Sequence, residues 1–145
     1  MTWNKEVLID SNLIIYASNT LATEYKDAKN FINTIKTNNL IPIISHQNMF
    51  ETIRVLTHHK YKNPMSVNEA IGQVETYKSF SRIIYPTFQT DEIAIKIIKK
   101  YAIKSNSIFD AYLVATMISN EIGQIATLNV KNFDFYKEIK VIKPF

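Results

Sequence analysis

VLIDSNLIIYA, residues 7–17, is an apolar stretch interrupted by three small polar residues, Asp10, Ser11 and Asn12. Removing a lone carboxylate from water is costly unless the carboxylate is paired. The interruption therefore predicts that a buried strand over residues 6–9 ends at Asp10. Two explanations remain for the acid: it caps a short following helix, a common place for Asp, or a positive charge meets it there.

Working outward from this stretch, short apolar segments alternate with helical patterns. Strands are predicted at residues 6–9, 40–44, 82–85, 124–128 and 139–142, and helices at residues 21–38, 45–59, 64–80, 90–103 and 107–122. The alternation predicts an α/β fold with a central parallel sheet of about five strands, covered by helices on both faces. No repeat or linker divides the chain, so residues 1–145 are expected to form a single domain. Ligands of such folds bind beyond the carboxyl ends of the strands.

Composition excludes several classes of protein. The chain of 145 residues has no Cys, which rules out disulfides and thiolate chemistry, and its formal charge of +4 is a mild hint of a polyanionic partner. The lysines at positions 96, 99, 100 and 104 are more simply explained as a solvated helix face. No secretory signal or membrane-length apolar run is present in the sequence, so a soluble, cytoplasmic protein with no membrane partner is expected.

Three acids follow predicted strands or begin helices. Asp10 follows the first strand, Glu51 lies about two turns into the helix after the second, and Asp110 lies in the first turn of SIFDAYLVATM. Each also has an ordinary structural role: Asp10 as a helix cap, Glu51 as a solvated partner of Arg54, and Asp110 as half of a capping box with Ser107. The histidines lack metalloprotease spacing, and no P-loop, dinucleotide fingerprint or G-x-S-x-G motif occurs.

Four segments, VLIDSNLIIYA, IISHQNMFETIRVL, SIFDAYLVATM and IATLNVKNFDFY, in that order resemble the four blocks of the PIN-domain family. The chain is most similar to the small VapC-like ribonuclease toxins of type II toxin–antitoxin pairs. The resemblance implies a three-layer sandwich in which Asp10, Glu51 and Asp110 are catalytic, bind Mg²⁺ or Mn²⁺ and cut RNA. It also implies a cognate antitoxin and a homodimer.

The fourth block departs from the family pattern. Relatives usually carry an acid where this chain has Asn132, after Thr127 and Asn129, and the next acid, Asp134, follows Phe133. One metal-site carboxylate is therefore expected to be replaced by Asn132 or shifted to Asp134. Restoring the acid with Asn132→Asp is expected to tighten metal binding.

Elementary electrostatics agrees with this resemblance. Three neighbouring carboxylates repel one another, and one takes up a proton unless a cation is present. Mg²⁺ prefers oxygen ligands and keeps several waters. Ser11 and Asn12 are expected to orient Asp10 through hydrogen bonds, and Asn12, Thr127 and Asn129 are candidates to contact substrate.

Two other functions stay open from the sequence. The first is a catalytically degenerate PIN-like module that only binds RNA or a protein partner, for which Asn129 and Asn132 are the argument. The second is a receiver-like phosphoacceptor domain. The latter needs a second acid beside Asp10 and an Asp at the end of the third strand, and RIIYPTF has none.

Overall fold

A computed structural model describes residues 5–145, and within them the core is a five-stranded, all-parallel sheet. The strands are β1 (Glu6–Ile9), β2 (Ile41–Ser45), β3 (Arg82–Ile84), β4 (Gln124–Ala126) and β5 (Lys140–Ile142). Their order is β3-β2-β1-β4-β5, so β1 is central and has β2 and β4 as neighbours. The predicted α/β class and parallel sheet are confirmed.

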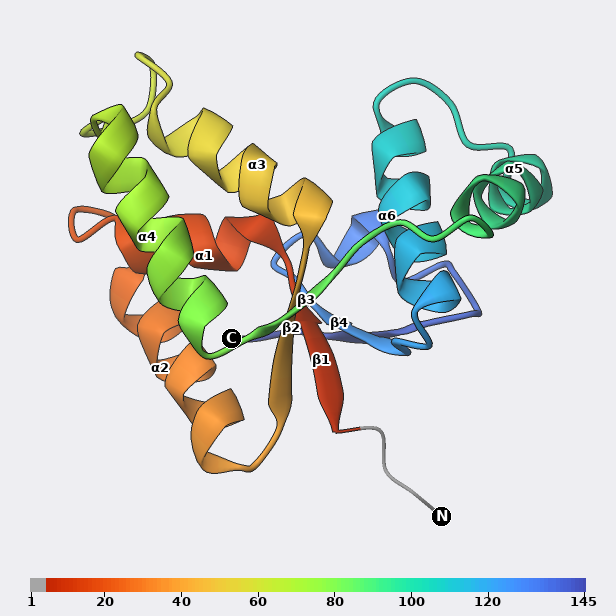
Figure 1. The fold of residues 1–145 in the computed structure, drawn as a ribbon, viewed down its shortest axis with the longest axis horizontal. Helices are drawn as coiled ribbons and strands as arrows, with labels where there is room; N and C mark the ends of the chain where they lie inside the picture. The colour runs from red at the N-terminus through yellow and green to blue at the C-terminus, as the bar shows by residue number, and fades with distance from the viewer. Residues whose placement is uncertain (1–4) are drawn as a thin grey trace.

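Helices cover both faces of this sheet and make the two outer layers of a three-layer sandwich (Figure 1). One face is covered by α1 (Ser11–Ser18), α2 (Tyr25–Thr37), α3 (His46–Leu56) and α4 (Val67–Ser79). The opposite face is covered by α5 (Thr90–Tyr101) and α6 (Ser107–Ser119). The sheet is therefore screened from water on both sides, and only its ends are open to ligands.

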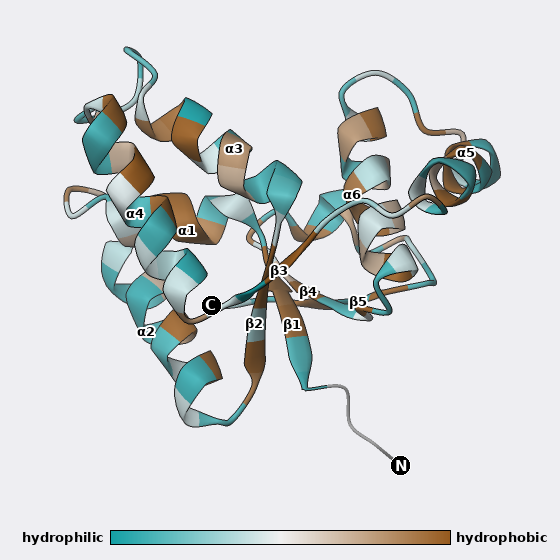
Figure 2. Ribbon diagram, viewed as in Figure 1, coloured by the Kyte–Doolittle hydropathy of each residue, from teal (hydrophilic) through white to brown (hydrophobic). Residues whose placement is uncertain are grey.

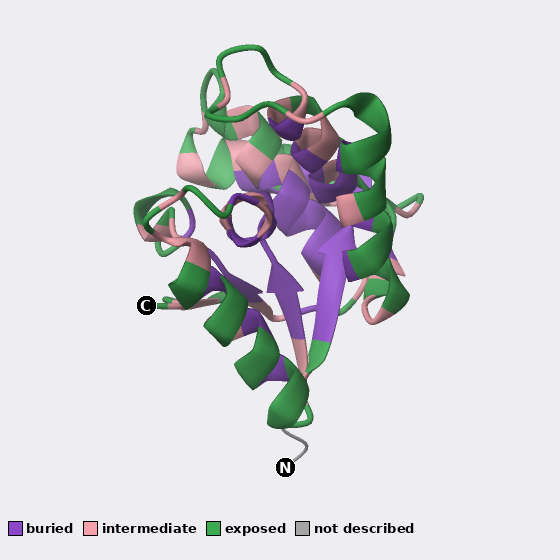
Figure 3. Cartoon of the chain, turned by 90° about the vertical axis from the view of Figure 1, so that its left-hand side faces the viewer, coloured by how far each residue is buried: buried purple, intermediate pink, exposed green. Residues whose placement is uncertain are grey.

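Alternation of side chains in the strands divides the core into two halves. Val7 and Ile9 pack with α1–α4, whereas Leu8 between them packs with α5 and α6. Because both faces are covered, a strand of this sheet is apolar at nearly every position, as Figure 2 shows by its brown colour. Figure 3 shows the same division by burial: the strands are buried, and the outer faces of the helices are exposed.

The predicted elements are present, with differences at their ends. The helix expected over 21–38 begins only at Tyr25, and the last turn of several helices is shorter than predicted. Ser66 and Glu69 form the predicted capping box of α4. The capping box weighed for Ser107 and Asp110 is wrong, because α6 begins after Asn106 and has no side-chain cap. Residues 1–4, the start of the predicted domain, lie outside the described residues.

Across residues 5–145, none of the helices is both long enough and apolar enough to cross a bilayer.

Candidate functional site

The carboxyl ends of three neighbouring strands meet at one small pocket. Asp10 directly follows β1, α3 begins directly after β2, and Thr127 directly follows β4. The pocket has a volume of about 100 Å³. It is lined by Asp10, Ser11, Asn12, Ile15, Gln47, Glu51, Asp110, Leu113, Asn129 and Phe133. We call this cavity the acid pocket, because three carboxylates line it and no Lys, Arg or His does.

Asp10 is fixed by donors from three separate segments of the chain. Its Oδ1 accepts from the Ser11 backbone N–H at 2.8 Å and from Asn48 Nδ2 at 3.3 Å. Its Oδ2 accepts from the Thr127 hydroxyl at 2.7 Å, with Asn12 Nδ2 more distant at 3.5 Å. The side chain is only 7% exposed. Asp10 is therefore both the N-cap of α1 and a pre-oriented carboxylate at the pocket wall.

The buried polar pair of Ser45 and Asn48 holds the Asp10 carboxylate in this position. The Ser45 hydroxyl caps α3 by accepting from the Asn48 N–H at 3.0 Å, and it donates to Asn48 Oδ1 at 2.7 Å. With its oxygen held by Ser45, the Asn48 amide must present its nitrogen to Asp10. Thr127 is held in turn by Asn12 Nδ2 at 3.2 Å. The rotamer of Asp10 is thus set by contacts from α3 and from the end of β4.

Glu51 and Asp110 complete the acidic wall. Both side chains are half-buried and line the acid pocket. Within residues 5–145 the Glu51–Arg54 ion pair weighed from the sequence is not formed; the acids in ion pairs there are Glu6, Glu92 and Glu138. Asp110 reaches the pocket from α6, whereas Glu51 comes from α3 on the opposite face of the sheet.

Burial and neighbouring negative charge raise the pKa values of Asp10 and Asp110. Burial, followed by the charges of Asp10 and Glu51, raises the pKa of Asp110 from 3.8 to about 6. Burial also raises the pKa of Asp10, although the hydrogen bonds from Thr127 and Ser11 oppose that shift. Both shifts are those expected of like charges that share a desolvated site without a neighbouring cation.

The donor set suits a hard divalent cation that keeps part of its water. All candidate ligands in the acid pocket are carboxylate or amide oxygens, which Mg²⁺ prefers, and Mg²⁺ is commonly bound through only one or two carboxylates. In the described part of the chain, no group of three or more His, Asp or Glu side chains is arranged so that it could hold a metal ion by itself. The pocket therefore fits a partly hydrated ion better than a fully coordinated one.

The fourth sequence block is divided between two cavities. Asn129 lines the acid pocket, and Thr127 contacts Asp10 from behind it. Asn132 and Asp134 are exposed and line a neighbouring cavity with Lys131 and Lys143. The acid pocket thus receives an amide, and no carboxylate, from this block. The ligand roles expected of Asn132 or Asp134 remain predictions.

This division gives a direct test of which position supplies the missing charge. Asn129→Asp adds a carboxylate to the acid pocket wall and is expected to tighten Mg²⁺ binding by about tenfold, because hard-cation affinity follows ligand charge. Asn132→Asp, the change expected to act from the sequence alone, is the matched comparison with the same charge. Calorimetric titration with Mg²⁺ measures both. A larger gain for Asn132→Asp would show that the turn over Val130–Asn132 moves when the ion binds.

Two residues at the site escaped sequence reasoning. Asn48 lies one helical turn before Glu51 and three residues after the cap Ser45. This spacing could have predicted that Asn48 contacts the cap and lies near the acids. Gln47 lines the acid pocket and donates from Nε2 to the Phe109 carbonyl at 3.1 Å, which connects α3 to α6. Nothing local marks Gln47, since its partner is distant in sequence.

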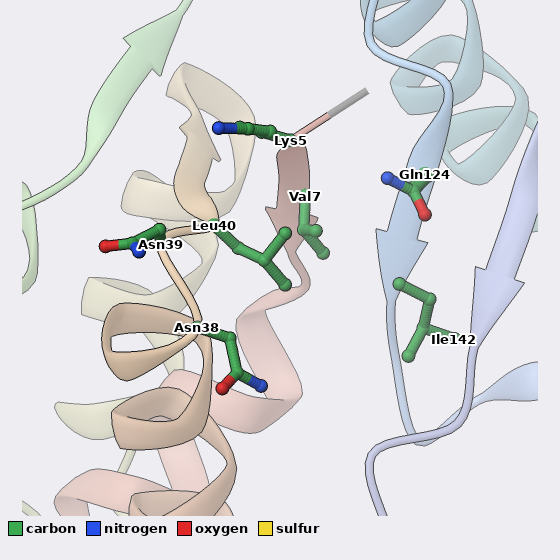
Figure 4. Close-up of a pocket in the computed structure, with 7 residues that line it drawn as sticks. All are labelled: Lys5, Val7, Asn38, Asn39, Leu40, Gln124 and Ile142. Carbon is green, nitrogen blue, oxygen red and sulfur yellow. The ribbon is translucent and has the colours of Figure 1, made fainter. Parts of the chain in front are cut away.

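A different cavity lies beside the starts of β1, β2 and β4, away from the acids (Figure 4). It has a volume of about 400 Å³ and is lined by Lys5, Val7, Asn38, Asn39, Leu40, Gln124 and Ile142. Figure 4 shows the Val7 and Leu40 side chains pointing toward one another. Because no carboxylate lines it, this cavity is no rival site for a cation.

Comparisons with known proteins agree with this geometry. The family model described as the PIN domain matches residues 7–137. No curated protein sequence matches the chain significantly.

Solved structures share the fold at low sequence identity. VapBC2 from Rickettsia felis, bound to a promoter DNA fragment, is 14% identical, with 94% of this chain and 97% of that chain covered and a TM-score of 0.71. VapC20 of Mycobacterium tuberculosis, a Sarcin-Ricin loop cleaving toxin, is 14% identical, with 92% and 98% covered and a TM-score of 0.68. A toxin-antitoxin complex from Klebsiella pneumoniae is 19% identical, with 96% and 98% covered and a TM-score of 0.63.

Proposed function

The chain belongs to the PIN domain family, and on that premise we propose that it is a divalent-metal-dependent endoribonuclease that hydrolyses RNA phosphodiester bonds. We propose further that it acts in the cytoplasm as the toxin of a type II toxin–antitoxin pair. The observation that carries the enzymatic proposal is the convergence of Asp10, Glu51 and Asp110 on one pocket that no basic side chain lines.

The three acids make the pocket selective for a cation before it can accept a phosphate. As it stands, the wall is negative and repels a phosphodiester. Asp10, Glu51 and Asp110 would hold Mg²⁺ or Mn²⁺, with the Asn129 amide as a neutral neighbour. When bound, the ion offsets charge on the phosphate oxygens and acidifies a water for in-line attack.

The chain's own residues have separate tasks in this proposal. Ser11, Asn48 and Thr127 hold Asp10 in one rotamer, so no ordering of that carboxylate is needed when substrate binds. The Asp110 side chain caps no helix, and a pKa raised to about 6 supports a role for this carboxylate as a proton acceptor near neutral pH. Asn12 donates toward Asp10 and Thr127 and lines the acid pocket, which supports a role for it in contacting substrate.

RNA as substrate is supported by charge and by likeness. The formal net charge of +4 favours a polyanion. The structurally similar VapC20 is described as cleaving the Sarcin-Ricin loop, and the fold of that protein matches this chain over nearly its whole length.

An antitoxin and a second copy of the chain are the proposed protein partners. The antitoxin is supported by the similar VapBC2 and Klebsiella complexes. The homodimer is supported by an apolar groove of about 430 Å³, lined by His46, Gln47, Pro86, Ile108, Phe109 and Tyr112. Phe109 is 66% exposed there, and exposed apolar patches of this kind mark interfaces. Because Gln47 also lines the acid pocket, a second copy on this groove would border the active site.

A degenerate module that binds RNA without cutting it is the second candidate. The observation that favours it is Asn129, an amide at the pocket wall where a carboxylate would strengthen a metal site. The retained set of Asp10, Glu51 and Asp110 argues for the enzyme.

Cleavage of a structured RNA, analysed on a denaturing gel, tests the proposal. The purified protein is expected to cut with Mg²⁺ or Mn²⁺, to stop with a chelator, and to recover when the ion is restored. Cutting that persists in chelator contradicts metal dependence. Metal-dependent protection against heat without any cutting would favour the binding module.

A further inference from the structure

The acid pocket adjoins a basic cavity on the other side of Asn129. This basic cavity has a volume of about 580 Å³. It is lined by Leu128, Asn129, Val130, Lys131, Asn132, Asp134 and Lys143. Because Asn129 lines the acid pocket as well, the two hollows share a wall.

Sheet topology explains why two lysines gather there. Lys131 lies in the turn that follows β4, and Lys143 directly follows β5. β4 and β5 are parallel neighbours, so both lysines lie at the same edge of the sheet as Asp10, which follows β1 on the other side of β4. This edge therefore carries acids at its centre and lysines at one side.

The two lysines give the basic cavity a net positive charge, because one carboxylate lines it with them. Both are exposed, and neither is in an ion pair within residues 5–145, where the paired lysines are Lys96 and Lys100. Asp134 lines the same cavity and is the one carboxylate in its wall. The acid pocket has no basic side chain of its own, so a polyanion with one phosphate in that pocket meets free positive charge across Asn129.

We propose that Lys131 and Lys143 bind a backbone phosphate of the RNA strand beside the phosphate that enters the acid pocket. The contact is electrostatic, so it positions the strand without selecting its sequence. Asp134 weakens the contact from the same wall. The inference rests on the proposed function for the identity of the strand, but it does not require that the strand be cut.

Binding of fluorescein-labelled poly(U), measured by anisotropy, isolates this contact from cleavage. All variants carry Asp110→Asn and are measured with a chelator. Lys131→Gln with Lys143→Gln is expected to lower the affinity about tenfold at about 50 mM salt. The slope of log K against log salt is expected to fall by about 0.7, which is the contribution of one single-strand phosphate contact. Asp134→Asn is expected to raise the affinity.

Lys99→Gln with Lys104→Gln is the matched control, because it also removes two exposed positive charges, from the end of α5 and the turn after it. It is expected to change the affinity less than twofold. An equal loss in both double variants would reduce the effect to net charge and overturn the proposal, as would the absence of poly(U) binding. Metal-dependent cutting by the wild-type protein, together with an unchanged poly(U) affinity of the Lys131→Gln/Lys143→Gln variant, overturns this inference alone. Lysine-dependent binding without any cutting overturns only the nuclease.

Discussion

Replacing Asp110 with asparagine is expected to slow RNA cleavage by about a thousandfold. A metal ion stabilises a charged transition state by several kcal/mol, and each ~1.4 kcal/mol lost is a factor of ten in rate. Asp110 is the informative acid. It lines the acid pocket, caps no helix by its side chain and is only half-buried, so its replacement leaves the local structure intact. Single-turnover cleavage of a labelled RNA with saturating Mn²⁺ measures the effect.

Glu75→Gln is the control for this loss. Glu75 is exposed on α4 and does not line the acid pocket, yet its replacement changes the charge by the same amount. Its rate is expected to stay within twofold of the wild type. A rate for Asp110→Asn that matches Glu75→Gln would remove Asp110 from the active site.

In the absence of metal, Asp110→Asn is expected to raise the melting temperature of the protein, and Asp10→Asn is expected to lower it. Asp110 has a pKa of about 6 in the folded protein and 3.8 as the reference value. Between those values the folded state holds a proton that the unfolded chain has lost, so stability falls as pH rises through this window and stays lower above it. After screening by solvent at this half-exposed group, Asp110→Asn is expected to return about 1 kcal/mol at neutral pH, or about 4 °C in melting temperature.

Asp10→Asn is expected to do the reverse. Its carboxylate accepts from Ser11, Asn48 and Thr127. An asparagine offers one acceptor oxygen, and its amide group would face one of these buried donors. Leaving a buried donor unsatisfied costs about 1–3 kcal/mol. Relief of the raised pKa of Asp10 offsets part of that cost, so a lower melting temperature, by several degrees, remains the expected result.

Thermal unfolding with a chelator at about pH 4 and about pH 7.5 tests both signs, with Glu75→Gln as the charge-matched control. The gain from Asp110→Asn should be present at the higher pH and absent at the lower, where the wild-type carboxyl is already protonated. If both aspartate variants melt below the wild type at neutral pH, Asp110 is not part of a repulsive cluster.

Prediction from sequence succeeded where structure depends on near neighbours. β1 was predicted with the bounds that the structure shows, because the apolar residues 7–9 are followed directly by Asp10. The capping box at Ser66 and Glu69 was also predicted correctly, since it depends on two side chains three residues apart. Helix ends were less accurate. α2 begins only at Tyr25 because residues 19–24 form successive turns, in which the Ala22 N–H donates to the Asn19 carbonyl and the Tyr25 N–H donates to the Ala22 carbonyl. The spacing of apolar residues did not distinguish these turns from the first turn of the helix.

The tertiary structure alone decided what surrounds each acid. Asp10 and Asp110 are a hundred positions apart, and the strand order β3-β2-β1-β4-β5 brings them to one pocket. The sequence alone named Asp10, Glu51 and Asp110 as candidates, through four short segments in a fixed order. It could not state that Asn48 and Thr127 hold Asp10, or that Asn129 and not Asn132 lines the pocket. The physical reason is that desolvation and charge coupling depend on through-space neighbours, whereas strands and caps depend on residues adjacent along the chain.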